Sequence, residues 1–263
     1  MAAEQGKVDP MHQFTIEPLF GSGHWEIAGY NIAFTNSALW MAIAAVALWV
    51  FVAGGMKRQL VPGRWQMAVE SFVGFIDDTL EANVGKEGRK YVPYIFSIFM
   101  FILFANLVGV MPIAIVPHLH TFAVTSHITV TAVLAFLSFG IVLAVGFWRH
   151  GLHFFSLFVP HGAPAWLMPV IIPVEFVSFM VRPFSLGLRL FVAMTAGHIL
   201  LEVFGSFVVQ GINAGGPLGW IVTLLSFVMI VGVSALELLV CAIQAYVFAL
   251  LTSLYINDAV NLH

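Results

Sequence analysis

Six ionisable side chains in the C-terminal part of the sequence lie inside long apolar runs, where charge is rare. They are Glu175, Arg182, Arg189, His198, Glu202 and Glu237. A charge at the centre of a bilayer costs about 2.5 to 3.5 kcal/mol on insertion scales, so such groups normally face a protein interior or a water-filled cavity. Six of them in two adjacent segments predict a hydrated path that protons can reach.

Helical spacing separates the first five of these residues into two groups. At 100° per residue, Arg182 lies about 20° from Arg189, and Glu175 lies about 40° from it. His198 falls about 180° from Arg189, and Glu202 follows His198 by one turn. We therefore expect Glu175 and Arg189 on one helix face and His198 with Glu202 on the opposite face.

Arg189 is the most difficult of the six to explain as a structural residue. Its immediate neighbours are apolar or glycine, and no acidic residue lies within four positions. Its counter-charge must come from elsewhere in the fold or from another subunit. Structural roles stay open for two others, because Arg182 could cap carbonyl groups or extend to the membrane interface, and Glu202 could pair with His198.

The second apolar segment holds Gln244 seven residues after Glu237, so the two side chains share a helix face. Cys241 is the only cysteine, which excludes an internal disulfide and favours a small buried apolar residue. The loop histidines are weaker candidates, since an H-x-H pair usually binds no metal and the others are most simply solvated: His118, His120, His150, His153 and His161. We predict no metal site and no cofactor.

The composition indicates an integral membrane protein. Of 263 residues, 60% are hydrophobic and 9% are charged, against about a quarter charged in soluble domains. Too few charges remain to cover a water-facing surface, so most of the chain must contact the lipid bilayer, and nucleic-acid binding is unsupported. The N-terminal segment lacks the basic start of a secretory signal, so we expect it to be retained.

Hydropathy and periodicity predict an all-α protein that forms one membrane domain over residues 1–263. Residues 64–90 combine nine charges with apolar residues at three- and four-residue steps, which is typical of an amphipathic helix on the membrane surface. The other expected elements are an external N-terminal segment, three transmembrane helices and two long apolar tracts: 1–35; 36–56, 93–115 and 122–148; 165–212 and 218–257.

The tract over 165–212 is too long for one ordinary crossing. As a single helix it would measure about 72 Å, more than twice the bilayer core, so it must fold back or lie steeply tilted. Pro183 is the natural place to divide it into two spans, and periodicity does not decide between the alternatives. The glycine- and proline-containing stretch 213–217 separates it from the next tract.

The basic residues predict the orientation. Seven of the ten follow the first and third spans, whereas the N-terminal tail holds only Lys7: Lys57, Arg58, Arg64, Lys86, Arg89, Lys90 and Arg149. The positive-inside rule places those loops in the cytoplasm or matrix and the N-terminus outside. With an odd number of crossings, the C-terminus lies inside.

Three stretches of the sequence resemble the a subunit of the F-type ATP synthase, in its alphaproteobacterial and mitochondrial form. The first runs from Pro183 through Arg189 to His198, and the second from Glu237 through Gln244 to Tyr255. The third begins at 62–66 with Glu70 and continues to Asn106, Leu107 and Pro112. The resemblance covers nearly the whole chain from about residue 36.

This resemblance implies the geometry that periodicity left open. The two long tracts would form a steeply tilted, nearly horizontal helical hairpin curved against a rotating ring of c subunits. Arg189 matches the essential arginine that faces the ring carboxylates, and Gln244 matches the glutamine beside it. Many relatives carry Asn where this chain has Ala193, which puts a hydrogen-bonding role there in doubt. The implied partners are the c ring, the b and b′ stalk subunits and the remaining synthase subunits.

The resemblance also implies two aqueous half-channels. Glu175 and Ser178 match polar positions of the half-channel that opens to the cytoplasm. His198 and Glu237 match an interacting pair on the outward side, where we also place Glu202. The subunit would separate the two passages, drive ring rotation with protons in a bacterial inner membrane, and leave nucleotide chemistry to its partners, since the sequence has no phosphate-binding glycine-rich loop.

Two other classes of protein compete with this interpretation. A secondary transporter predicts internal repeats with broken helices in matching positions, and no convincing repeat is present. A purely structural subunit of a respiratory complex leaves the six intramembrane charges without a role.

Overall fold

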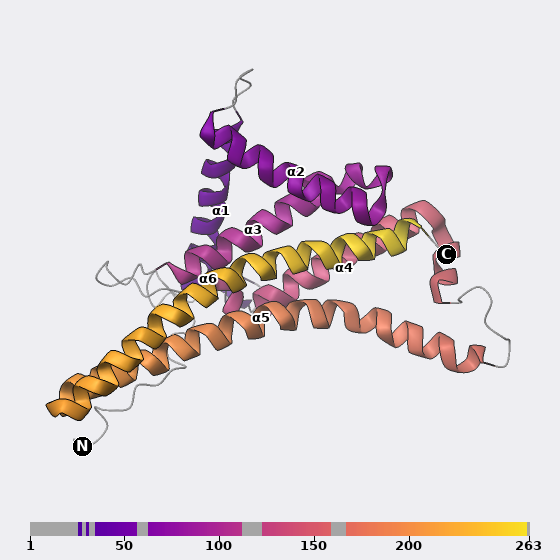
Figure 1. Ribbon diagram of the computed structural model, residues 1–263. Coiled ribbons are helices and arrows are strands. Elements are labelled where there is room, and N and C mark those ends of the chain that lie inside the picture. The colour runs from indigo at the N-terminus through magenta and orange to yellow at the C-terminus, as the bar shows by residue number, and fades with distance from the viewer. Residues whose placement is uncertain are drawn as a thin grey trace.

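The computed structural model describes residues 26–27, 30–31, 35–56, 63–111, 123–158 and 167–261, and helices dominate them (Figure 1). A single two-residue strand pair, β1 (Glu26–Ile27) and β2 (Tyr30–Asn31), precedes them, with Glu26 opposite Asn31. The helices are α1 (Asn36–Gly55), α2 (Arg64–Val84), η2 (Lys86–Tyr91), α3 (Val92–Val110), η4 (Val124–Ser126), α4 (Ile128–His150), η5 (Gly151–Phe158), α5 (Met168–Ala214) and α6 (Gly216–Val260).

Five helical segments are long and apolar enough, by length and composition, to cross a bilayer. They are 36–55, 86–110, 128–150, 168–214 and 216–260. The all-α membrane fold expected from composition is therefore confirmed. The apolar surface supports it, since side chains such as Leu218 and Trp220 remain 78% and 66% exposed within this chain and need lipid or another subunit to cover them.

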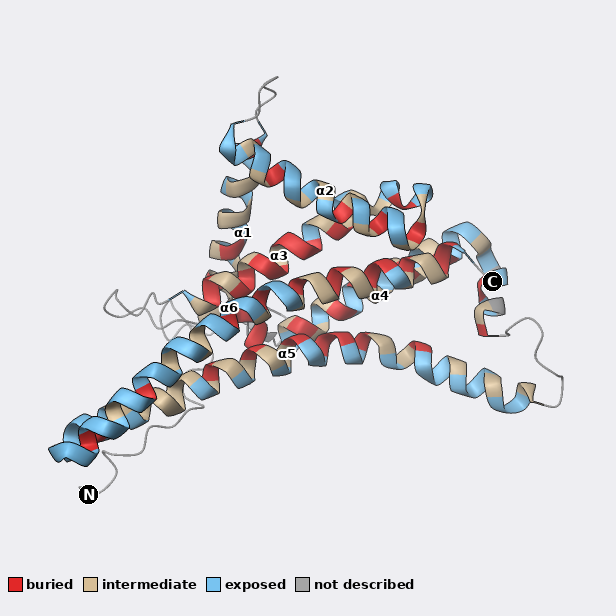
Figure 2. Cartoon of the chain, in the orientation of Figure 1, coloured by how far each residue is buried: buried red, intermediate tan, exposed pale blue. Residues whose placement is uncertain are grey.

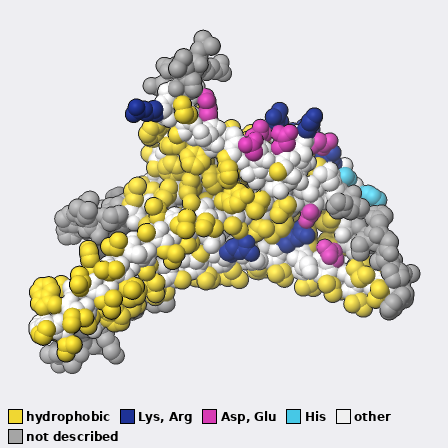
Figure 3. Space-filling view, viewed as in Figure 1, with side chains coloured by type: hydrophobic (Ala, Val, Ile, Leu, Met, Phe, Trp, Pro, Cys, Tyr) yellow, Lys and Arg dark blue, Asp and Glu magenta, His cyan; other side chains and the backbone are white. Residues whose placement is uncertain are grey.

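The helix α2 has the amphipathic character that its sequence predicts. Two residues of this helix, Ile76 and Leu80, are fully buried. Acidic and basic side chains gather over α2 and η2 (Figure 3). The α-helix ends at Val84, before the expected residue 90, because Gly85 has a φ of +79° that favours glycine. The chain continues as the 3₁₀ helix η2.

The helices α5 and α6 form a long antiparallel hairpin, and they run obliquely to α1 (Figure 1). Gly215 and Gly216 make the turn, with φ values of +62° and +70° that L side chains rarely adopt. The helix α5 continues for 47 residues through Pro173 and Pro183 without division. Of the two alternatives for this tract, the structure therefore contains the single long helix.

The core lies where the middle of the hairpin packs against α3 and α4. Figure 2 shows buried residues on the facing sides of these helices and exposed residues along the far end of the hairpin. Met100 of α3, Met194 of α5 and Ile256 of α6 are fully buried there. This packing fixes the middle of α5, which carries most of the predicted site residues.

Candidate functional site

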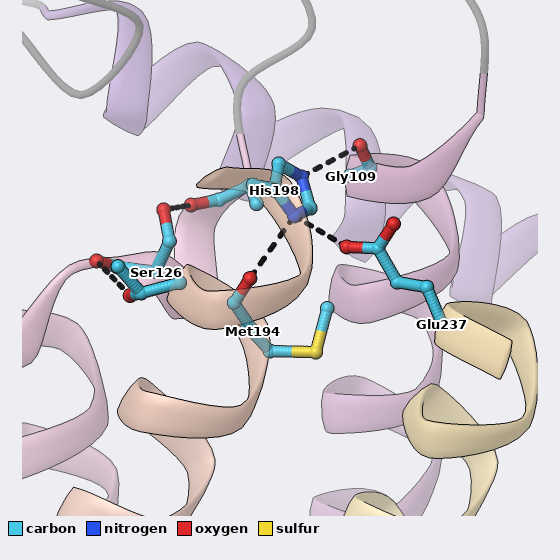
Figure 4. Close-up of polar contacts among 7 residues, drawn as sticks. Gly109, Ser126, Met194, His198 and Glu237 are labelled. Atoms are coloured by element: carbon cyan, nitrogen blue, oxygen red, sulfur yellow. Dashed lines mark hydrogen bonds and ion pairs between the residues drawn. The ribbon is translucent and has the colours of Figure 1, made fainter. Parts of the chain in front are cut away.

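A buried histidine and a buried glutamate meet between the two helices of the hairpin (Figure 4). His198 extends from α5 and Glu237 from α6, and 2.5 Å separates Nδ1 of the imidazole from Oε1 of the carboxyl group. The two side chains are only 8% and 2% exposed. Because each group can compensate the charge of the other, the buried pair costs less than either charge would cost alone.

Two backbone carbonyl groups fix the orientation of the His198 ring. Nε2 lies 3.3 Å from the Gly109 carbonyl oxygen of α3, and Nδ1 lies 3.1 Å from the Met194 carbonyl oxygen. A carbonyl oxygen only accepts, so the Nε2–H group donates to Gly109. Nδ1 faces both the Met194 carbonyl oxygen and Glu237, so a proton on Nδ1 can be donated to the carbonyl oxygen or shared with the carboxylate. The arrangement is suited to accepting and releasing a proton.

The close approach of Glu237 to α5 depends on a glycine. A Cβ atom at Gly197 would lie 2.8 Å from Oε1 of Glu237, so any larger residue would displace the carboxyl group.

Polar contacts also join the neighbouring helices. Asn106 of α3 donates its Nδ2–H to the Cys241 carbonyl at 3.3 Å, and Thr195 donates to the Ser126 carbonyl at 3.3 Å.

Arg189 lies in a different environment on the same helix. It is exposed at the surface, and it makes no ion pair or hydrogen bond with the residues that the structure describes. The structure also buries His198 while exposing Arg189, in agreement with their expected separation around α5. Figure 3 shows Lys or Arg side chains among hydrophobic ones on the hairpin, and Arg182 and Arg189 are the only Lys or Arg residues in the sequences of α5 and α6.

Arg182 has the acidic partner that Arg189 lacks. Its Nη1 atom donates to Oδ2 of Asp258 at 2.7 Å, near the C-terminal end of α6. Asp258 is the residue that sequence reasoning missed, because it lies one position past the expected end of the second tract. A search for an acid able to neutralise Arg182 would have found it.

Three of the remaining predicted site residues, Glu175, Ser178 and Gln244, are not brought together by direct contacts among the described residues. Glu175 and Gln244 are half-buried and Ser178 is exposed, and none of the three makes an ion pair or side-chain hydrogen bond within the described chain. Glu202 is half-buried one turn beyond His198.

The loop positions contribute little to this site. His150 places Nε2 3.1 Å from the Val260 carbonyl oxygen, and His153 is exposed. Five predicted positions lie outside the described residues: Lys57, Arg58, His118, His120 and His161. Among the residues that the structure does describe, no group of three or more His, Cys, Asp or Glu could hold a metal ion.

The fold is that of a multi-pass membrane protein, and paired titratable side chains such as His198 and Glu237 inside membrane helices are typical of the ion-translocating class. Comparison with known proteins narrows this class, because the family described as "ATP synthase A chain" matches residues 37–257. The chain is 68% identical to "ATP synthase subunit a" of Erythrobacter litoralis over 263 residues, 66% identical to that of Rhizorhabdus wittichii over 263, and 67% identical to that of Sphingopyxis alaskensis over 264, with all of both chains covered each time.

The chain therefore belongs to the family of ATP synthase a subunits, the proton-translocating stator subunits of the F-type membrane sector. Members of this family do not catalyse ATP chemistry themselves and act as part of the complete synthase. The bacterial relatives place this multi-pass protein in a cell inner membrane.

Proposed function

We propose that the subunit provides two separate aqueous half-channels, which load and unload protons on the carboxylates of a c-subunit ring, and that Arg189 keeps them apart. One observation carries this proposal. The hairpin presents an exposed guanidinium that is unpaired among the described residues, while it buries a paired imidazole and carboxyl group inside. A cation inside an apolar membrane segment normally faces a water-filled cavity or an anionic partner, and a neighbouring subunit would supply that partner here.

The outward half-channel would end at His198 and Glu237, with Glu202 along it. A proton arriving from outside would pass through the shared site between Nδ1 and Oε1 and neutralise a ring carboxylate. Only the neutral carboxyl group can enter lipid at low cost. The loaded c subunit would therefore rotate away from Arg189.

Arg189 would act as an electrostatic barrier. Its guanidinium stays protonated in proteins, so it attracts an ionised carboxylate but does not relay protons. Placed between the two passages, it would favour release of the proton on one side and prevent direct flow from the other. Gln244 would lie beside it and contribute polar contacts at the ring surface.

The second half-channel would open to the cytoplasm near Glu175 and Ser178. After nearly a full turn, the ring carboxyl group would lose its proton there. Each proton that moves down a potential of 100 mV releases about 2.3 kcal/mol. Several protons are therefore needed for each ATP made in the catalytic subunits.

The orientation and the other partners belong to the same proposal. The excess of Lys and Arg in the loops after the first and third spans favours an outside N-terminus and a cytoplasmic C-terminus. The face that meets the ring is the hairpin surface bearing Arg189. We assign the contacts with the b and b′ stalk subunits to the remaining apolar surface.

The test is Arg189→Ala in the complete synthase, reconstituted in lipid vesicles. We expect loss of proton-driven ATP synthesis together with passive proton leak through the membrane sector, because the barrier between the half-channels is gone. Leu188→Ala, at the adjacent exposed position, is the matched control and should retain coupling. Coupled synthesis by the Arg189→Ala enzyme would contradict the proposal.

A further inference from the structure

Two arginines lie on nearly the same side of α5, yet only one has a counter-charge among the residues that the structure describes. Arg182 and Arg189 are seven residues apart, which on a continuous helix corresponds to about 20° of rotation and about 10.5 Å of rise. The helix runs through both positions without interruption. Arg182 pairs with Asp258, whereas Arg189 makes no ion pair with the residues described here.

Three groups from two helices hold the Arg182 guanidinium. Oδ2 of Asp258 accepts a hydrogen bond from Nη1 at 2.7 Å. The Cζ atom of Arg182 lies 5.3 Å from the centroid of the Phe179 ring and 5.0 Å from that of Tyr255. Both distances are in the range of cation–π attraction. The side chain is therefore fixed in place, and its charge is balanced by one carboxylate.

The ion pair between Arg182 and Asp258 is only partly buried. The side chains of Arg182 and Asp258 are 21% and 35% exposed, and large apolar side chains on the same stretch of α5 are more exposed still, among them Val181 at 51% and Phe184 at 55%. A charged group that moves along this surface could approach Arg182 if Asp258 did not occupy it. In a poorly hydrated setting such an attraction would be strong.

We propose that Asp258 is a positioning residue that neutralises Arg182, so that Arg189 remains the single uncompensated cation on the part of α5 that the rotor carboxylates pass. The inference rests on the proposed function of Arg189. Without Asp258, Arg182 would become a second attractive site about two helical turns from the first. A ring carboxylate held there would stay ionised and would oppose rotation.

A purely structural role for the pair predicts a different pattern of variants. If the ion pair serves only to join α5 to α6, loss of either partner removes the same bond and leaves the other group unpaired, so the two single variants are similarly impaired. If Asp258 serves to neutralise Arg182, loss of the acid is harmful only while the cation is present, and loss of the arginine is tolerated. The two roles therefore differ in the Arg182→Gln variant.

The experiment measures ATP-driven proton pumping by the complete synthase in inverted membrane vesicles, per assembled complex, for Asp258→Asn, Arg182→Gln and the double variant. We expect Asp258→Asn to lower pumping about tenfold or more. Arg182→Gln and the double variant should stay within about twofold of the unaltered enzyme, since neither leaves a free cation. Asp258→Glu keeps the charge and should also retain pumping.

Two results would overturn the inference. One is near-normal pumping by Asp258→Asn, and the other is an Arg182→Gln variant or a double variant as impaired as Asp258→Asn. Arg189→Ala, measured in parallel, separates this failure from failure of the proposed function. If Arg189→Ala abolishes coupling while the Asp258 series departs from the expected order, only the role of Asp258 is wrong.

Discussion

His198 and Glu237 lie inside the molecule with side chains only 8% and 2% exposed, whereas Arg189, nine residues earlier on α5, is exposed and unpaired among the described residues. In the buried region, carbonyl groups and a carboxyl group of the same chain surround the imidazole. The surface region has no counter-charge among the described residues, and the proposed function assigns that charge to another subunit.

This difference shows how one helix can carry two kinds of charge in a membrane. The titratable pair is held in contact, so each group can compensate a charge on the other. In the proposed function, the permanent cation faces the rotor, and its partner would change as the ring turns. The 180° separation expected from helical spacing allows both arrangements on the same segment.

Arg189→Lys tests the surface region, because it keeps the formal charge there and changes only the group that carries the charge. We expect proton-driven ATP synthesis to fall by at least about tenfold, since lysine lacks the planar fork of donors and can lose its proton in an apolar setting. Rates of synthesis and of passive proton leak in reconstituted vesicles measure the effect. Full coupling with lysine would show that any cation suffices there.

Glu237→Gln tests the buried region by removing its ionisable acid with almost no change of shape. Passive proton flow through the membrane sector, measured in vesicles stripped of the catalytic sector, should drop by about a hundredfold if the pair transfers protons. Glu237→Asp is the control, because it retains a carboxyl group and should conserve part of the flow. An unchanged rate in the glutamine variant would remove the pair from the proton path.

Gly197→Ala tests the geometry of the buried region, because it displaces the buried pair without removing a charge. The added Cβ atom would lie 2.8 Å from Oε1 of Glu237, so the carboxyl group must shift, and we expect roughly a tenfold loss of proton flow. Gly205→Ala is the matched control on the same helix, since no atom beyond its own helix lies within 4 Å of a Cβ there. Equal flow in the two variants would mean that the contact distance is unimportant.

Much of this architecture could be predicted from the sequence because it depends on local properties. Hydropathy over about 20 residues reveals the membrane segments, and period-3.6 spacing distinguishes the charged α2 from them. The same periodicity predicted that His198 and Arg189 face different ways. The path of α5 through Pro183 was not predictable from periodicity, because a proline in a membrane helix either ends it or is accommodated by its surroundings, and only the resemblance to a known family implied the long hairpin.

The sequence by itself determined that this is a helical membrane protein with six charges in its apolar tracts, since both follow from which residues are adjacent in the chain. Only the tertiary structure decided which of those charges are compensated. Arg182 is neutralised by a residue 76 positions away, and His198 is oriented by a carbonyl group 89 positions away. Such contacts arise from the way α5 and α6 fold back against α3, and no local pattern encodes that geometry.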